Sequence, residues 1–294
     1  MDNQIKILEK SELPQALLEI PQPPEKLYMI GELPKEENLV FLCVVGSRKY
    51  TSYGRDITEK LIEGLAGYPV VIVSGLALGI DSIAHQKAID VGLKTIAFPG
   101  SGLKEKVIYP KSNFGLARRI IEKGGCLLSE FEPDFEATVW SFPCRNRLMT
   151  GISRAILVIE AEQKSGTLIT ARMATDYNRD VLAVPGSVFS PNSVGTNRLI
   201  RQGATPITNS DELLEALGFP AGGGSASGGN VRQAQLFEEC SPEEKEILEI
   251  LREPISRDEI TRRLGKNTSE INTLLSIMEI KGLIKEEMGE IRMI

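Results

Sequence analysis

The sequence has few of the residues that most often hold metals or close disulfides. Its 294 residues include one histidine and four cysteines. The cysteines are far apart and form no CxxC pair, so neither zinc-ligand spacing nor a disulfide framework is predicted. They are Cys43, Cys126, Cys144 and Cys240. We therefore expect no metal site.

Long apolar runs and targeting patterns are also absent. No run approaches the length of a membrane span, and the start MDNQIKILEK lacks a charged-then-apolar signal pattern. Hydrophobic residues make up 41% of the chain and charged residues 25%, which is ordinary for a soluble globular protein. We expect a cytoplasmic protein. The net charge of −6 argues against broad nonspecific binding to nucleic acids, although it leaves room for a local basic patch.

Short apolar runs alternate with helical segments from Leu39 onward. Near-continuous Val, Ile and Leu in each run predicts strands buried on both faces, hence a parallel sheet with helices above and below it. The runs are LVFLCVVG (39–46), PVVIVSG (69–75), KTIAFPG (94–100), CLLSEF (126–131), AILVIEA (155–161) and DVLAVPG (180–186). This alternation predicts a doubly wound α/β domain over residues 39–219.

Three further regions flank this domain. Residues 1–38 are rich in Pro and Glu and are predicted to be an irregular extension. Residues 220–238 contain AGGGSASGGN and are predicted to form a flexible linker. Residues 239–294 show three helical segments and two short strands around Met288-Gly289, an order typical of a winged helix-turn-helix domain.

Glycine-containing turns follow most of the predicted strands. They are Gly46-Ser47-Arg48, SGLALGID (74–81), FPGSG (98–102), KSGTLIT (164–170) and PGS (185–187). One such turn would only reverse the chain, but five on one rim favour a crevice that binds anions through backbone N–H groups. Neither GxGxxG nor GxxxxGK[ST] is present, so no dinucleotide or ATP cofactor is predicted. A polynucleotide backbone fits better.

The stretch WSFPCRNR (140–147) combines cations and aromatic rings. Single-stranded nucleic acid is held by cations along its backbone and by aromatic faces under its bases. Phe142, Arg145 and Arg147 supply both elements, with Asn146 as a hydrogen-bonding partner and Arg48 able to converge on them. Trp140, the one tryptophan, is predicted to lie in the core.

These motifs resemble those of the DNA-processing protein DprA (Smf) family. The resemblance rests on VGSRKYTSYG (45–54), SGLALGIDSIAHQKAI (74–89), FPGSGL (98–103), FPCRNRLMTGIS (142–153), SGTLITAR (165–172) and VPGSV with GTNRLIRQGA (184–188, 195–204). It implies a Rossmann-like domain that binds single-stranded DNA, protects it and loads RecA during natural transformation and recombination, without catalysis. It also implies a homodimer, and residues around 172–201 are candidates for its contact surfaces.

The resemblance implies a set of binding residues around Arg48 as the principal phosphate ligand. The set is Gly46, Ser47, Arg48, Gly100, Ser101, Phe142, Arg145, Arg147, Ser165, Gly166 and Thr167, and the residues themselves add Asn146 and Lys164. The chain departs from the family in having neutral residues at 138–141, where many members carry a cation. Lys104, Lys106, Lys111 or Lys164 could supply it. The 38 residues before the domain are also too few for the helical module with which many members begin.

Two enzymatic alternatives remain from the residues alone. Pro133-Asp134 with Glu162-Gln163-Lys164 has the form PD…ExK of metal-dependent nucleases, although this short motif arises often by chance. A nucleotide phosphoribosyl hydrolase of related fold would need an acid in the phosphate loop. SGTLITAR offers none, while Asp81 and His85 could mimic an acid–base pair.

The predicted winged-helix domain is acidic. Between Cys240 and Ile294 it has nine Lys or Arg and twelve Asp or Glu residues. A winged helix that reads duplex DNA usually has a basic recognition helix, whereas TSEINTLLSIMEIKG (268–282) carries one lysine and two glutamates. This charge favours a protein-contact or regulatory role.

Overall fold

The structure is a computed structural model that describes residues 5–35, 38–219, 241–251, 255–264, 267–281, 283–287 and 290–293. The chain divides into two compact units, Met1–Ala226 and Ser227–Ile294. Each unit has its own sheet and its own core, and each is described by itself. The predicted linker, residues 220–238, lies outside the described residues.

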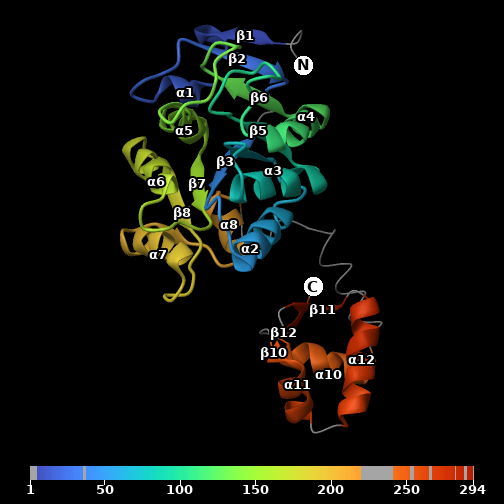
Figure 1. Cartoon of the computed structure of the whole chain (residues 1–294). Coiled ribbons are helices and arrows are strands. Elements are labelled where there is room, and N and C mark those ends of the chain that lie inside the picture. Colours follow the sequence, from blue (N-terminus) through green and yellow to red (C-terminus); the bar gives the residue numbers. More distant parts are fainter. Residues whose placement is uncertain are drawn as a thin grey trace. The chain divides into compact units, whose positions relative to one another are not determined.

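A nine-stranded sheet runs through the described part of the larger unit (Figure 1). Its strand order is β1-β2-β6-β5-β4-β3-β7-β8-β9. The strands are β1 (Lys6–Glu9), β2 (Lys26–Gly31), β3 (Val40–Val45), β4 (Val70–Ser74), β5 (Lys94–Ala97), β6 (Cys126–Ser129), β7 (Ala155–Val158), β8 (Asp180–Ala183) and β9 (Thr205–Pro206). All pairings from β6 to β9 are parallel, which confirms the predicted doubly wound sheet.

Helices cover both faces of this sheet (Figure 1). One face packs on α1 (Gln15–Leu18), α5 (Ser141–Ile152), α6 (Gly166–Asp176) and α7 (Val194–Arg201). The other packs on α2 (Ser52–Glu63), α3 (Ile80–Asp90), α4 (Phe114–Glu122) and α8 (Ser210–Ala216). In β3 the side chains alternate between the two cores, with Cys43 and Val45 on one side and Leu42 and Val44 on the other. Burial of both faces explains why the strands read as continuous apolar runs.

The first 38 residues are more ordered than the sequence suggested. The prediction of an irregular extension is wrong for the described part, because β1 and β2 continue the sheet beyond β6. Both new pairings are antiparallel, β1 with β2 and β2 with β6. Leu27 and Ile30 of β2 are fully buried, so this strand pair extends the core. The prolines of this segment lie outside the two strands, where they do not disturb the ladder.

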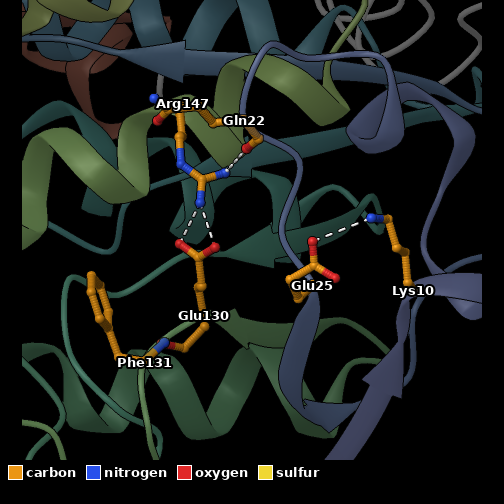
Figure 2. A network of polar contacts seen from close by, with 7 residues as sticks. Lys10, Gln22, Glu25, Glu130, Phe131 and Arg147 are labelled. Carbon is orange, nitrogen blue, oxygen red and sulfur yellow. Dashed lines mark hydrogen bonds and ion pairs between the residues drawn. The ribbon is translucent and has the colours of Figure 1, made fainter.

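Arg147 of α5 fastens this N-terminal segment to the domain (Figure 2). Its Nη2 donates to both carboxylate oxygens of Glu130, and its Nη1 donates to the Gln22 carbonyl at 2.6 Å. The Arg147 side chain is only 12% exposed in this pair, against 52% for Lys10 in the nearby Lys10–Glu25 ion pair. A fork-shaped, desolvated guanidinium pair is the stronger kind. The Arg147 guanidinium thus binds groups of the protein itself rather than facing solvent.

The smaller unit has the predicted winged-helix order. It contains α10 (Pro242–Ile250), β10 (Ile255–Ser256), α11 (Arg257–Leu264), α12 (Thr268–Ile280), β11 (Ile284–Glu287) and β12 (Glu290–Met293). The strands form one antiparallel sheet in the order β10-β12-β11. The predicted turns at Gly265 and Met288-Gly289 lie outside the described residues. Among the described helices of the whole chain, none is long and apolar enough to cross a membrane.

The ion pair of Arg147 yields a stability prediction. Arg147→Ala should lower the free energy of unfolding by about 1–3 kcal/mol, because it leaves Glu130 and the Gln22 carbonyl without their donor. The measurement is urea unfolding followed by the fluorescence of Trp140, the only tryptophan, which reports on the larger unit. Lys10→Ala removes the exposed ion pair and should cost under about 1 kcal/mol. Equal losses of unfolding free energy in the two variants would contradict the assignment of Arg147 as the residue that holds the N-terminal segment.

Candidate functional site

A cavity of about 410 Å³ opens at the carboxyl ends of the central strands. The strand order reverses at β3, whose neighbours β4 and β7 continue in opposite directions along the sheet. Such a switch point is where open α/β sheets bind ligands. The lining includes Gly46, Ser47, Arg48 and Lys49 after β3, Glu162 after β7, Phe142, Pro143, Arg145 and Asn146 on α5, and Ser165, Gly166 and Thr167 at the start of α6.

Arg48 is the cation that this cavity presents to solvent. Its guanidinium carbon lies 5.4 Å from the centre of the Phe142 ring, a cation–π contact. The residue is exposed and forms no ion pair with any described residue. Lys49, which the sequence analysis overlooked, adds a second exposed cation to the lining. Glu162 lines the same cavity and moderates this positive charge.

A buried carboxylate fixes the loop that carries Arg48. Glu160 is 2% exposed and accepts hydrogen bonds from the backbone N–H of Thr51 at 3.0 Å and from its hydroxyl at 2.5 Å. Thr51 in turn caps α2 by accepting from the Gly54 N–H at 3.1 Å. Sequence reasoning missed Glu160, and the signal was a carboxylate inside the apolar run AILVIEA.

The N-terminus of α6 forms the opposite wall. Ser165 caps this helix by accepting from the Thr167 N–H at 3.2 Å, and Thr167 donates its hydroxyl to the Gly46 carbonyl at 3.3 Å. Nothing lies within 4 Å of where a Cβ on Gly166 would stand, so the backbone there is open to a ligand. The positive end of the helix dipole favours an anion at this wall.

Arg145 lines the cavity, but as a buried side chain rather than as a cation open to a ligand. Only 5% of the residue is exposed, and its Nη1 donates to the Phe98 carbonyl at the end of β5. Burial lowers its pKa, while the negative charge of Asp81 raises it again. Asp81 itself accepts from the N–H groups of Gly75 at 3.1 Å and Ala77 at 3.4 Å. Arg145 therefore forms the floor of the cavity and ties α5 to two strand ends.

Two glycines of the predicted phosphate turns make room for α5 instead. A Cβ on Gly75 would overlap the Arg145 guanidinium, and a Cβ on Gly100 would overlap the Phe142 ring. Ser101 is fully buried and donates to the Gly102 carbonyl. Gly100 and Ser101 do not line the cavity, so their predicted role as ligands is not supported by the geometry.

Arg147 and Lys164 also lie outside the lining. Arg147 points into the ion pair of Figure 2, so its predicted place beside the crevice is corrected. Lys164 is exposed and immediately precedes the α6 cap. Of the other lysines proposed as a substitute cation, Lys104 and Lys106 both pair with Asp134, at 2.6 and 3.0 Å.

The acidic residues of the nuclease alternative are not brought together in the cavity, and the histidine of the hydrolase alternative is buried. Asp134 is held by two lysines and does not line the cavity, whereas Glu162 does. Among the described residues, no group of three or more His, Cys, Asp or Glu side chains is placed to hold a metal. His85 is fully buried, with its Nδ1 2.7 Å from the Thr95 hydroxyl, so it cannot serve as the base beside Asp81.

Fold and site together define a doubly wound domain with an arginine-bearing cavity at its switch point, in one chain with a winged-helix unit. The chain belongs to the DNA recombination-mediator protein A (DprA) family, whose model matches residues 4–218. The model of the DprA winged helix domain matches residues 233–290.

Related proteins agree with this membership. Protein Smf of Escherichia coli is 42% identical over 206 residues, which cover 70% of this chain and 54% of that protein. The chain thus spans about half the length of that relative. The X-ray structure of DprA from Streptococcus pneumoniae matches with a TM-score of 0.66 at 37% identity, covering 72% of this chain and 74% of that one. DprA from Helicobacter pylori, described for its single-stranded DNA binding mode, matches with a TM-score of 0.66 at 34% identity, covering 73% and 95%.

The two arginines of the cavity should differ in their effect on stability. Arg145→Met should lower the free energy of unfolding by about 1–3 kcal/mol, because it leaves the buried Phe98 carbonyl without its donor and removes the positive charge near Asp81. Arg48→Ala should stay within about 0.5 kcal/mol of wild type, since it removes an exposed side chain. Urea unfolding monitored by Trp140 fluorescence checks both. Equal stability of the two variants would show that Arg145 is not structural.

The buried His85 predicts a pH effect. Burial, with a smaller contribution from Arg145, lowers its pKa to about 3. Because the folded pKa lies below the unfolded value of about 6.5, its contribution to stability is present above pH 6.5 and is lost as the pH falls. Between pH 7 and pH 5 the loss should be about 2 kcal/mol relative to His85→Gln.

Urea unfolding of both proteins at a series of pH values measures this difference, and His85 is the only histidine. Comparison with the variant is needed because burial raises the pKa of Asp81, which acts in the opposite direction. A stability difference that does not change between pH 7 and pH 5 would show that His85 is solvated or charged in the folded state.

Proposed function

We propose that this chain binds single-stranded DNA in the cavity at the switch point, as a non-enzymatic DNA-processing protein of natural transformation and recombination. The observation that carries the proposal is the exposed Arg48 guanidinium over the Phe142 ring. A cation for phosphate beside an aromatic face for a base is the combination that single-stranded nucleic acid requires. The single-stranded DNA binding described for the Helicobacter pylori relative supports it.

The cavity walls fit a sugar-phosphate backbone better than a free nucleotide. Arg48 and Lys49 supply positive charge from one side, and the α6 N-terminus at Gly166 supplies it from the other. Asn146 adds an amide that can bond a phosphate or a base edge. Because the bases are met mainly by stacking, we expect little sequence preference.

Protection of incoming DNA, delivery to RecA and homodimerisation complete the proposal, and the family resemblance supports them. A dimer would present two cavities to one strand and raise its affinity through multivalency. A second hollow of about 990 Å³ is lined by residues of α6 and α7, between positions 168 and 205, and overlaps the candidate contact region 172–201. Its lining mixes Leu199 and Val181 with Arg172 and Arg198, which suits a protein surface.

The test is fluorescence anisotropy of a labelled oligo-dT, in EDTA, over a salt series. Wild type should bind with an affinity that falls steeply with salt. Arg48→Ala should weaken binding about tenfold or more and reduce the slope of log affinity against log salt by about 0.7, since one phosphate contact is lost.

The matched control is Arg118→Ala, which removes an exposed arginine of α4 that does not line the cavity. It should bind like wild type. Wild-type binding that requires Mg²⁺, or equal binding by Arg48→Ala, would contradict the proposal. Duplex DNA that competes as well as single strand would count against base stacking.

A further inference from the structure

Three aromatic rings lie beside the cavity without belonging to its lining. We call Phe131, Phe135 and Trp140 the aromatic cluster. Phe131 and Phe135 stack with centroids 4.5 Å apart, and each contacts the Trp140 indole edge-on, at 5.6 and 5.5 Å. The predicted core position of Trp140 is wrong, because 56% of this residue is exposed. The three rings together leave an apolar patch open to solvent, and such patches often mark binding sites.

The backbone on both sides of the indole is held in place. The Thr138 N–H donates to the buried Ser141 hydroxyl at 3.0 Å, and that hydroxyl donates to the Gly100 carbonyl at 2.5 Å. Trp140 has helical backbone angles and immediately precedes the first residue of α5. The indole is therefore presented by a rigid element, which lowers the entropy cost of using it for binding.

Trp140 lies one helical turn from the cavity. Residues three apart are neighbours on a helix surface, and the residue three positions on is Pro143, which lines the cavity next to Phe142. The rise between them is about 4.5 Å along α5. Pro143 and Trp140 therefore give a path from the cavity to the indole along α5.

Most of the charges around the cluster are paired. Four acidic residues lie on the loop that carries Phe131 and Phe135, and three of them have cationic partners. Glu130 pairs with Arg147, Glu132 with Lys26, and Asp134 with Lys104 and Lys106, while Glu136 is exposed. With these lysines engaged, the cluster offers an apolar face rather than free cations. It suits a nucleobase better than a phosphate.

We propose that Trp140 stacks on a nucleobase of the strand held in the cavity, which extends the single-stranded DNA site along α5. This proposal rests on the proposed function. Phe131 and Phe135 act as positioning residues that hold the indole in place. Continuity with the cavity is what favours a base over an apolar protein partner, whose binding is the alternative outcome of the test.

The sequence provides a direct probe, because Trp140 is the only tryptophan. Its intrinsic fluorescence should be quenched when the full chain is titrated with unlabelled oligo-dT, since stacking brings a base against the indole. Short oligonucleotides that fill only the cavity should bind with little quenching, and longer ones should quench strongly.

Anisotropy of a labelled oligo-dT tests the energetic contribution. Trp140→Ala should weaken binding about 5- to 150-fold, the range for loss of one stacked base. The salt slope should stay at the wild-type value, because no phosphate contact is lost. Trp140→Phe keeps an aromatic ring, so its affinity should lie between those of wild type and Trp140→Ala. Val139→Ala removes an 87% exposed apolar side chain from the adjacent position and is the matched control, with wild-type binding expected.

The outcomes separate this inference from the proposed function. If wild type binds and Arg48→Ala is weakened, but the indole is unquenched and Trp140→Ala binds like wild type, the stacking proposal fails alone and the cluster becomes a candidate protein contact. Weaker binding by Trp140→Ala with a reduced salt slope, or without quenching of the wild-type indole, would also overturn stacking. Absence of wild-type binding would reject the proposed function itself.

Discussion

The buried guanidinium of Arg145 organises the carboxyl end of the sheet. It holds the Phe98 carbonyl, faces the negative charge of Asp81, and fills space that only a glycine at position 75 leaves open. Through Asp81 it is coupled to the turn after β4. Helix α5 is thereby seated over the strand ends, and the cavity is the space that remains between it, α6 and the β3 loop. Because the guanidinium is buried, a shift of α5 that separated it from the Phe98 carbonyl would leave a charged donor without an acceptor, so the arrangement has little freedom to vary.

Some arginines of this acidic chain bind groups inside the fold, whereas Arg48 is exposed at the cavity. Closeness in the sequence does not predict which role an arginine has. Arg145 and Arg147 are two residues apart, yet both are engaged inside the fold, one with a strand end and one with the N-terminal segment. Arg48 comes from a distant loop, is held in place through Thr51 and Glu160, and keeps its guanidinium exposed over Phe142. Local positive charge at the cavity is therefore compatible with a net charge of −6.

The sheet could be predicted from the sequence because its physical signal is local. All six apolar runs became parallel strands, since burial on both faces demands continuous apolar residues. Strands β1 and β2 were missed because they are antiparallel and lie in a segment rich in proline and glutamate. The cavity's place at the strand ends followed from topology, and Arg48, Phe142, Asn146 and the start of α6 were found there.

The errors concern partners that no sequence pattern reveals. A run such as WSFPCRNR shows charge and aromaticity, but it does not show whether the folded chain supplies a carbonyl or carboxylate acceptor for each arginine. Helical periodicity in fact places Arg145 and Arg147 on different sides of α5. Trp140 was assigned to the core as the one tryptophan, whereas it packs on Phe131 and Phe135 at the surface. Gly75 and Gly100 gave the pattern of a phosphate turn because close approach of a side chain and of a ligand demand the same residue.

The measurement that tests the account most directly is a crystal structure of the chain with bound oligo-dT. We expect a phosphate within hydrogen-bonding distance of Arg48 and the first residues of α6, with Arg145 still on the Phe98 carbonyl and Arg147 still on Glu130. A strand bound elsewhere, or an Arg145 side chain released from the interior to contact phosphate, would contradict the central claim that the fold uses Arg145 to shape the cavity and Arg147 to hold the N-terminal segment, and leaves Arg48 to bind.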